Sequence, residues 1–368
     1  MKARSLARSL VGNRPALKQL FAQADQQLQV AKHSGAARFP WLLRPRTRNL
    51  TVAITARCNL RCEGCRYGRD FMPGHELPLG IVETMLEDAA EAGVESIRLY
   101  GGEPLLHRDL PRMVERAVEL GLDAYVTTNA TLLERRIDEL HAAGLRFLTI
   151  GFYGTDEAYE SYVGRGGAFA RIERGVAAVR ERFGDEVRLR LNWLLMRPTC
   201  NLRSLEGALD FARRYKAPVQ IDLIHYSLPY FSEGPERRLQ FRPEDRPAID
   251  LVVGELLRVQ REEPGLIEQG ALALRSIPDW LIQGPAMRVP CDKYEMLWIG
   301  ADGTVQLCYV TFRLGNLHQT RLRDILYTRE HREAGRKAFG LQCPNCHCGY
   351  DSRTAKHAES RRRYSGKA

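Results

Sequence analysis

From Leu50 onward, short runs of apolar and β-branched residues alternate with longer stretches whose apolar residues recur at helical spacing. The short runs predict strands, and the longer stretches, several of them closed by a glycine, predict helices. The predicted strands are 50–55, 96–100, 124–128, 146–150, 187–195 and 219–224. Six strands that are each followed by a helix indicate an α/β fold with a parallel sheet, either open or curled toward a barrel. In such barrels the chemistry lies on loops after the carboxyl ends of the strands.

The pattern changes after about residue 230. A helical stretch at 248–265 is followed by two apolar runs around Asp302-Gly303, which predict a β-hairpin. A helical pattern at 321–336 and the segment CPNCHC come next. We therefore expect five regions: an N-terminal helical extension (1–49), a barrel (50–230), a helical linker (231–285), a small hairpin-and-helix module (286–350) and a disordered basic tail (351–368).

Composition indicates a folded chain that works inside the cell. With 368 residues and 44% hydrophobic residues, the chain can bury a large core. It has no apolar run of 18 residues and no secretory signal, so we expect no transmembrane segment and a cytoplasmic location. The N-terminal stretch is basic and weakly amphipathic, which allows peripheral membrane contact, although a packing helix is the simpler interpretation. Its apolar positions are Leu6, Leu10, Leu17, Leu20 and Phe21.

The formal net charge is +10. No basic stripe interleaved with aromatic residues precedes the tail, so we expect no nucleic acid partner. Positive charge also suits the docking of an acidic flavodoxin or ferredoxin, because complementary charge accelerates encounter.

Nine cysteines without an export signal favour metal or redox chemistry over disulfides. Cys58, Cys62 and Cys65 form a Cys-x3-Cys-x2-Cys loop directly after the first predicted strand. A structural zinc site needs four ligands, and the sequence offers no fourth nearby. Three thiolates on a cubane iron-sulfur cluster would leave one iron open to a reactive ligand. A zinc site completed from elsewhere and three unrelated thiols remain the alternatives.

The segment LYGGEP, residues 99–104, ends the second predicted strand. Its glycines allow close backbone approach to a ligand, and Glu103 brings a carboxylate to the edge that carries the cysteines. Taken alone, the segment also fits an ordinary turn between a strand and a helix.

Together, the cysteine loop and LYGGEP resemble the radical S-adenosylmethionine (SAM) enzymes over roughly residues 50–225. The resemblance implies a partial (βα)6 TIM barrel. It also implies that Cys58, Cys62 and Cys65 hold a [4Fe-4S] cluster whose open iron binds SAM. Gly101, Gly102 and Glu103 would receive the SAM amino group. In this family, reductive cleavage of SAM gives a 5′-deoxyadenosyl radical that removes a hydrogen from the substrate.

Further positions carry over from the family one at a time, each with a structural role as the alternative. Asn129 lies in TTNA, which looks like the family's Thr-Asn-Gly segment. The resemblance places Thr149 and Asn192 at the SAM ribose and Arg165 at its carboxylate. The family usually has an aromatic residue before the third cysteine, but this chain has Gly64, so we predict that Tyr67 contacts the adenine.

The second cysteine group brackets the predicted hairpin and ends in a CxxC. By spacing alone, zinc and an iron-sulfur cluster fit equally well. The arrangement resembles the twitch or SPASM extension of the radical SAM family, in which a cysteine precedes a Gly-x4-Cys segment. This resemblance implies one auxiliary [4Fe-4S] cluster, because too few cysteines remain for two. The implied ligands are Cys291, Cys308, Cys343 and Cys346, with Cys348 as the alternative. For Cys200 and His347 we expect a buried thiol and a solvated imidazole.

We therefore expect a radical SAM enzyme of oxidoreductase type that acts in natural product biosynthesis. The outcome would be oxidation, epimerisation or rearrangement of a small-molecule substrate. An auxiliary cluster closed by four thiolates could accept the electron left after hydrogen removal, which would give net oxidation. Only 49 residues precede the first strand, too few for a winged-helix peptide-recognition domain, so a peptide-modifying maturase is the alternative. A nucleic-acid-binding protein with zinc-cysteine sites is a remote alternative, in which LYGGEP would have no role.

Overall fold

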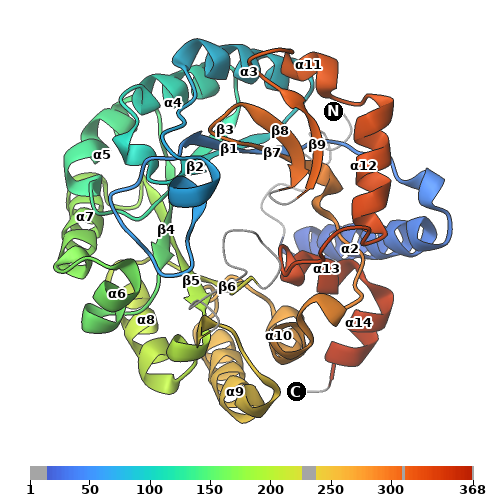
Figure 1. The fold of residues 1–368 in the computed structure, drawn as a ribbon. Helices are drawn as coiled ribbons and strands as arrows, with labels where there is room; N and C mark the ends of the chain where they lie inside the picture. Colours follow the sequence, from blue (N-terminus) through green and yellow to red (C-terminus); the bar gives the residue numbers. More distant parts are fainter. Residues whose placement is uncertain (1–14, 226–237, 309–310, 367–368) are drawn as a thin grey trace.

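A computed structural model of the chain describes residues 15–225, 238–308 and 311–366, and its centre is one curved sheet (Figure 1). Along the sheet the strands follow the order β6-β5-β4-β3-β2-β1-β7-β8-β9. Strands β1 to β6 are parallel and match the six predicted strands to within two residues. The strands are β1 Asn49–Thr55, β2 Ser96–Gly101, β3 Asp123–Thr128, β4 Phe147–Phe152, β5 Arg188–Leu195, β6 Val219–Leu223, β7 Met296–Ile299, β8 Thr304–Cys308 and β9 Thr311–Asn316.

Helices surround the curved sheet, as Figure 1 shows for α3 to α9. Those that follow strands β1 to β5 bury their apolar faces against it, which confirms the partial (βα)6 barrel. The helices are α2 Pro15–Arg38, α3 Leu79–Glu91, α4 Leu110–Glu119, α5 Leu133–Ala142, α6 Asp156–Val163, α7 Ala168–Phe183, α8 Leu202–Arg214, α9 Arg246–Glu262, α10 Ala271–Gln283, α11 Leu322–Ile325, α12 Arg329–Phe339, α13 Tyr350–Lys356 and α14 Ala358–Tyr364. None of the helices in the described ranges is both long and apolar enough to cross a membrane.

The predicted hairpin is present, and its strands continue the sheet of the barrel. Strand β7 pairs in parallel with β1, from Asn49 opposite Met296 to Val52 opposite Ile299. β8 and β9 then continue the same sheet in antiparallel order. One hydrophobic core therefore runs from the barrel into the C-terminal region.

The tail prediction was wrong for the described residues up to 366, which form most of α13 and all of α14 instead of a disordered end. The tail packs on α10, where Trp280 donates a hydrogen bond to Thr354 at 3.0 Å. Tyr364 is buried and donates to Asp279 at 2.6 Å. Burial here uses tyrosine, threonine and arginine side chains, so the segment lacks the apolar periodicity that predicts a packed helix.

Two further predictions concern the remaining helices. The stretch at 321–336 contains two helices, because the backbone is extended at Leu326 after α11 and has a positive φ of 59° at Tyr327, before α12 begins at Arg329. Of the apolar positions in the N-terminal stretch, Leu6 and Leu10 lie outside the described residues. Leu20 and Phe21 are exposed on α2, and membrane contact remains a prediction.

Candidate active site

The loop with Cys58, Cys62 and Cys65 leaves the carboxyl end of β1 and is held by backbone hydrogen bonds. Its Arg61 and Glu63 amides donate to the carbonyl oxygens of Val163 and Tyr162 at the end of α6, at 3.0 and 2.8 Å. The loop that carries the three thiols is thus held against the end of α6.

The LYGGEP segment lies directly against this loop. The amides of Gly102 and Glu103 donate to the carbonyl oxygens of Thr55 and Arg57, each at 2.8 Å. A Cβ at Gly101 or Gly102 would come closer than 3.0 Å to those same oxygens, and Gly101 has φ +143°. Both positions therefore require glycine, because a side chain would separate the two loops.

Glu103 is fully buried and binds the end of β3. Its carboxylate accepts hydrogen bonds from the Thr128 hydroxyl at 2.6 Å, the Asn129 amide at 2.8 Å and the Leu105 amide at 3.0 Å. Burial raises the pKa of Glu103 to about 7, and these hydrogen bonds oppose the shift. Both carboxylate oxygens therefore accept hydrogen bonds from within the protein.

Two of the predicted side chains, Asn129 and Arg165, contact the cysteine loop itself. The Asn129 side chain donates to Asn59 at 2.9 Å, and its nitrogen lies 4.0 Å from the Cys58 sulfur. Arg165 donates to the Asn59 carbonyl oxygen at 2.7 Å and is otherwise exposed. Both residues hold the loop at Asn59, a residue that our sequence reasoning missed although it directly follows the first cysteine.

Cys62 and Cys65 are partly buried, whereas Cys58 is exposed. Burial raises the pKa of Cys62 and Cys65, and the neighbouring thiols raise that of Cys62 further. Arg69 opposes these shifts and donates to the carbonyl oxygens of Cys65 and Cys62 at 2.5 and 3.3 Å. In the described parts of the chain, no three His, Cys, Asp or Glu side chains converge on a point for a single metal ion. A cluster is compatible with that spacing, because its thiolates bind different irons.

Thr149 and Asn192 lie on neighbouring strands, in different surroundings. Thr149 is fully buried, and its hydroxyl lies 2.5 Å from that of Thr127 on β3. The side-chain oxygen of Asn192 is also buried, but it has no hydrogen-bond partner among the described residues. A buried oxygen without a partner is costly, and a ligand hydroxyl would remove that cost.

The environment of Tyr67 argues against the adenine contact predicted for it. The ring is buried and meets Trp298 of β7 edge-on, with centroids 6.4 Å apart. Its hydroxyl accepts a hydrogen bond from the Ala301 amide at 3.3 Å and donates to Met72 at 3.2 Å. Tyr67 therefore joins the cysteine loop to the C-terminal hairpin.

Charged side chains that our sequence reasoning missed lie on the strands near these residues. Arg98 of β2 donates to Thr127 at 2.8 Å and stacks over Tyr100 at 4.9 Å. Burial raises the pKa of Asp222 on β6, and Arg98 is the strongest opposing charge. The sequence pattern could have identified Arg98 and Asp222, since both occupy polar positions that alternate with buried ones along their strands.

The second cysteine group gathers four of its five thiols at the end of β6. The Cys346 thiol affects the pKa of both Cys291 and Cys343, and Cys348 lies against Cys346. The Cys348 sulfur lies 3.9 Å from His225. Cys308 ends β8 and donates to the Thr311 carbonyl oxygen at 3.9 Å, and the intervening residues 309–310 lie outside the described ranges.

Of the two residues without an assigned role, Cys200 has the environment we expected and His347 does not. Cys200 is buried, as expected. His347 is buried instead of solvated, and its Nδ1 lies 3.1 Å from the Ile224 carbonyl oxygen. The imidazole is buried because the residues on either side of it in the sequence, Cys346 and Cys348, lie at the end of β6.

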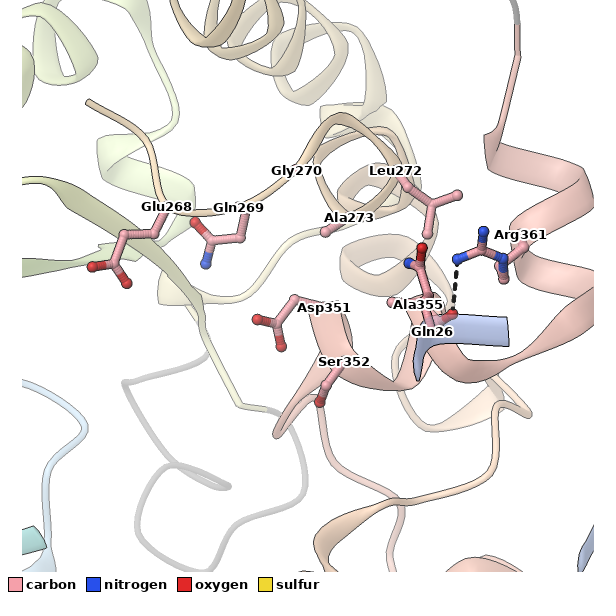
Figure 2. Close-up of a pocket in the computed structure, with 10 residues that line it drawn as sticks. All are labelled: Gln26, Glu268, Gln269, Gly270, Leu272, Ala273, Asp351, Ser352, Ala355 and Arg361. Atoms are coloured by element: carbon pink, nitrogen blue, oxygen red, sulfur yellow. Dashed lines mark hydrogen bonds between the residues drawn. The ribbon is translucent and has the colours of Figure 1, made fainter. Parts of the chain in front are cut away.

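A cavity of about 410 Å³ borders the barrel on the side of β6 (Figure 2). In Figure 2, the side chains of Glu268, Gln269 and Asp351 extend toward the same space. Glu268 accepts a hydrogen bond from Arg190 of β5 at 3.2 Å, and the charge of Asp351 raises the pKa of Asp222. One residue of the cavity wall is thus hydrogen-bonded to a charged residue of β5. The full lining is Gln26, Glu268, Gln269, Gly270, Leu272, Ala273, Asp351, Ser352, Ala355 and Arg361.

Two family models match the chain. Residues 52–212 match the Radical SAM superfamily, and residues 291–348 match the SPASM iron-sulfur cluster-binding domain. A probable GTP 3′,8-cyclase from Methanococcus maripaludis (strain C6 / ATCC BAA-1332) is 30% identical over 176 residues, which are 47% of this chain and 58% of the relative. The chain spans about half the length of the curated relatives it matches.

Two solved structures share the fold at 17% sequence identity and a TM-score of 0.62 each. One is native anSMEcpe with bound AdoMet and Kp18Cys peptide, and the match covers 79% of this chain and 83% of that one. The other is Streptococcus suis SuiB bound to precursor peptide SuiA, with 92% and 76% covered.

Proposed function

The chain belongs to the radical SAM superfamily and ends in a SPASM-type iron-sulfur domain, and we propose that it abstracts hydrogen from a small, polar substrate. One observation supports the SAM site above all others. The cysteine loop and the Gly101-Gly102 backbone are hydrogen-bonded to each other where β1 and β2 end, at positions that exclude any side chain.

The residues at this edge fit the two cofactors of the family. Cys58, Cys62 and Cys65 would hold the cluster, and the carbonyls of residues 101–103 would bind the SAM amino group. Asn192 would bind the ribose, since its buried side-chain oxygen has no hydrogen-bond partner in the described ranges. When bound, the cluster supplies the electron that splits SAM into methionine and a 5′-deoxyadenosyl radical.

Thr149, Arg165 and Asn129 already make hydrogen bonds within the protein, and these bonds limit their roles at the SAM site. Thr149 has no exposed surface and would support the ribose site through Thr127. Arg165 would reach a SAM carboxylate only with the guanidinium nitrogens that do not hold Asn59. Asn129 would act on Cys58 through the loop.

The charges near the strand ends support a polar substrate. Arg98 and Asp222 are partly buried charges of opposite sign, and they suit a ligand that carries ionic or hydrogen-bonding groups. The neighbouring cavity of about 410 Å³ lies in the size range of small-molecule sites. Holding the substrate hydrogen near the radical carbon, away from water, is positioning work for these residues. Net oxidation remains one of three outcomes proposed, beside epimerisation and rearrangement.

Oxygen-free reconstitution with iron, sulfide, dithionite and SAM tests the proposal. We expect 5′-deoxyadenosine from the wild-type chain and from Cys200→Ala, whose thiol lies outside both groups, but none from Cys58→Ala. A Cys58→Ala chain that produced the nucleoside at the wild-type rate would refute the assignment.

The substrate class is tested by stimulation of that reaction. A low-molecular-mass fraction of a cell extract should raise 5′-deoxyadenosine formation, and a deuterated substrate should transfer deuterium to it. Stimulation by the peptide fraction alone would favour the alternative of a peptide-modifying maturase, in keeping with the peptides bound in the two solved structures. A flavodoxin or ferredoxin donor should deliver electrons more slowly as ionic strength rises, because the attraction to this basic chain is screened.

A further inference from the structure

Arg353 is a buried arginine in the segment that sequence reasoning assigned to a disordered tail. Only 1% of its surface is exposed. Its guanidinium group lies over the ring of Trp280, 4.6 Å from the centroid. The helix that carries it, α13, begins two residues after the last cysteine of the chain.

The guanidinium group ties together the two segments that carry the second cysteine group. It donates to the Cys346 carbonyl oxygen at 2.6 Å and to the Asn345 side chain at 3.0 Å. It also donates to the carbonyl oxygen of Val289, two residues before Cys291. The Asn345 amide in turn donates to the Met287 carbonyl oxygen at 2.8 Å. The planar guanidinium group of Arg353 therefore holds both segments at one point.

This buried cation lacks the partner that such cations usually have. Across the described residues, no carboxylate forms an ion pair with Arg353, and its Nε is buried without a hydrogen-bond partner. A buried charge is costly unless an opposite charge compensates for it. The cysteines of the second group are the nearest candidates to supply that opposite charge, because Arg353 donates to the carbonyl oxygen of Cys346 itself and to that of Val289, close to Cys291.

We propose that Arg353 is the counter-cation and positioning residue of the auxiliary cluster, where it orders the Cys343–Cys348 loop and raises the reduction potential of the cluster. This inference rests on the proposed function, which places an iron-sulfur cluster on the second cysteine group. A cluster held by thiolates gains negative charge on reduction. A fixed cation in a medium of low dielectric constant stabilises that reduced form more than the oxidised one.

The two roles can be separated with two substitutions of Arg353. Arg353→Gln removes the charge but keeps an amide donor. Arg353→Lys keeps the charge but cannot donate to three acceptors arranged around a planar fork. Arg362→Gln is the matched control, because Arg362 is an exposed arginine of the same tail.

The experiment uses the full chain with Cys58, Cys62 and Cys65 replaced by alanine, so that any bound iron belongs to the second group. Iron and sulfide content is measured after oxygen-free reconstitution, and the reduction potential is followed by electron paramagnetic resonance. We expect Arg353→Gln to shift the potential to more negative values than the control. Arg353→Lys should keep a potential near that of the control but bind less iron.

A thermal unfolding comparison provides a second readout. Arg353→Gln should lower the melting temperature of the iron-loaded chain more than that of the iron-free chain, since only the loaded chain offers the cation its counter-charge. If Arg353→Gln fails to fold, the iron content of Arg353→Lys against the control still decides the positioning role.

The inference is overturned if Arg353→Gln and Arg353→Lys match the Arg362→Gln control in both iron content and potential. If the background chain binds no iron even with Arg353 intact, the auxiliary cluster itself is refuted. SAM cleavage by the unmodified chain, measured separately, decides whether the rest of the proposed function stands.

Discussion

Replacing Thr128 by valine should destabilise the protein in a way that depends on pH, because Thr128 is the side chain that donates to buried Glu103. Valine has the same shape, so the change removes two hydrogen bonds and little volume. One is the 2.6 Å bond to the Glu103 carboxylate, and the other is the 2.9 Å bond that the hydroxyl accepts from the Ala130 amide. A bond to a charged group contributes about 1.5–3 kcal/mol and a neutral one about 1 kcal/mol.

The sign of the pH dependence follows from the raised pKa of Glu103, which is about 7. A carboxyl group whose pKa is higher in the folded state contributes stability that is fully present below its unfolded pKa. That stability is lost as pH rises through the folded value. Loss of the Thr128 donor raises the folded pKa further, so the variant should lose more stability than wild type as pH rises. We expect losses of about 2 kcal/mol near pH 6 and about 3 kcal/mol near pH 8.5.

Urea unfolding of the reconstituted, oxygen-free protein at the two pH values measures this difference. Thr128→Ser keeps the hydroxyl and removes one methyl group, so it should cost about 1 kcal/mol at both pH values. An equal loss for Thr128→Val at the two pH values would refute the view that the hydroxyl stabilises an ionised Glu103.

Three further predictions concern the two cysteine groups and the SAM site. Gly101→Ala should abolish iron binding at the first group, because its methyl group would meet a carbonyl oxygen. Gly80→Ala is the control: Gly80 lies on α3 with open space around it, so this change should leave the melting temperature unchanged or raise it. Asn192→Ala should raise the KM for SAM in a 5′-deoxyadenosine assay by about tenfold, the equivalent of one lost hydrogen bond, and an unchanged KM would remove Asn192 from the SAM site. Cys346→Ser should lose the auxiliary iron while Cys348→Ser keeps it, and the reverse result would assign Cys348 as the ligand.

Much of the barrel could be predicted from the sequence. The six strands follow from local patterns, because β1 and β4 are short runs of nearly continuous buried residues, and the other four alternate buried with less buried positions. The cysteine loop and LYGGEP were also readable, since their chemistry depends on residue types at fixed spacing. Their meeting at one edge follows from parallel strands that end on the same side.

Side-chain environments could not be read in this way. Tyr67 is near the cysteines in sequence, but the hairpin that covers it is more than 200 residues away. Glu103 was expected to face a ligand, but its carboxylate binds the end of β3. In both cases the deciding contact comes from a distant segment, and local spacing carries no information about it.

The sequence by itself determined the barrel strands and the positions of the two cysteine groups, because each depends on residues close in the chain. The tertiary structure alone decided that the C-terminal hairpin extends the barrel sheet through β1 and β7. It also decided that the basic tail folds back to bury Arg353 beside the second cysteine group. Backbone pairing and the burial of a charge depend on which surfaces meet, and that is settled only when the whole chain packs.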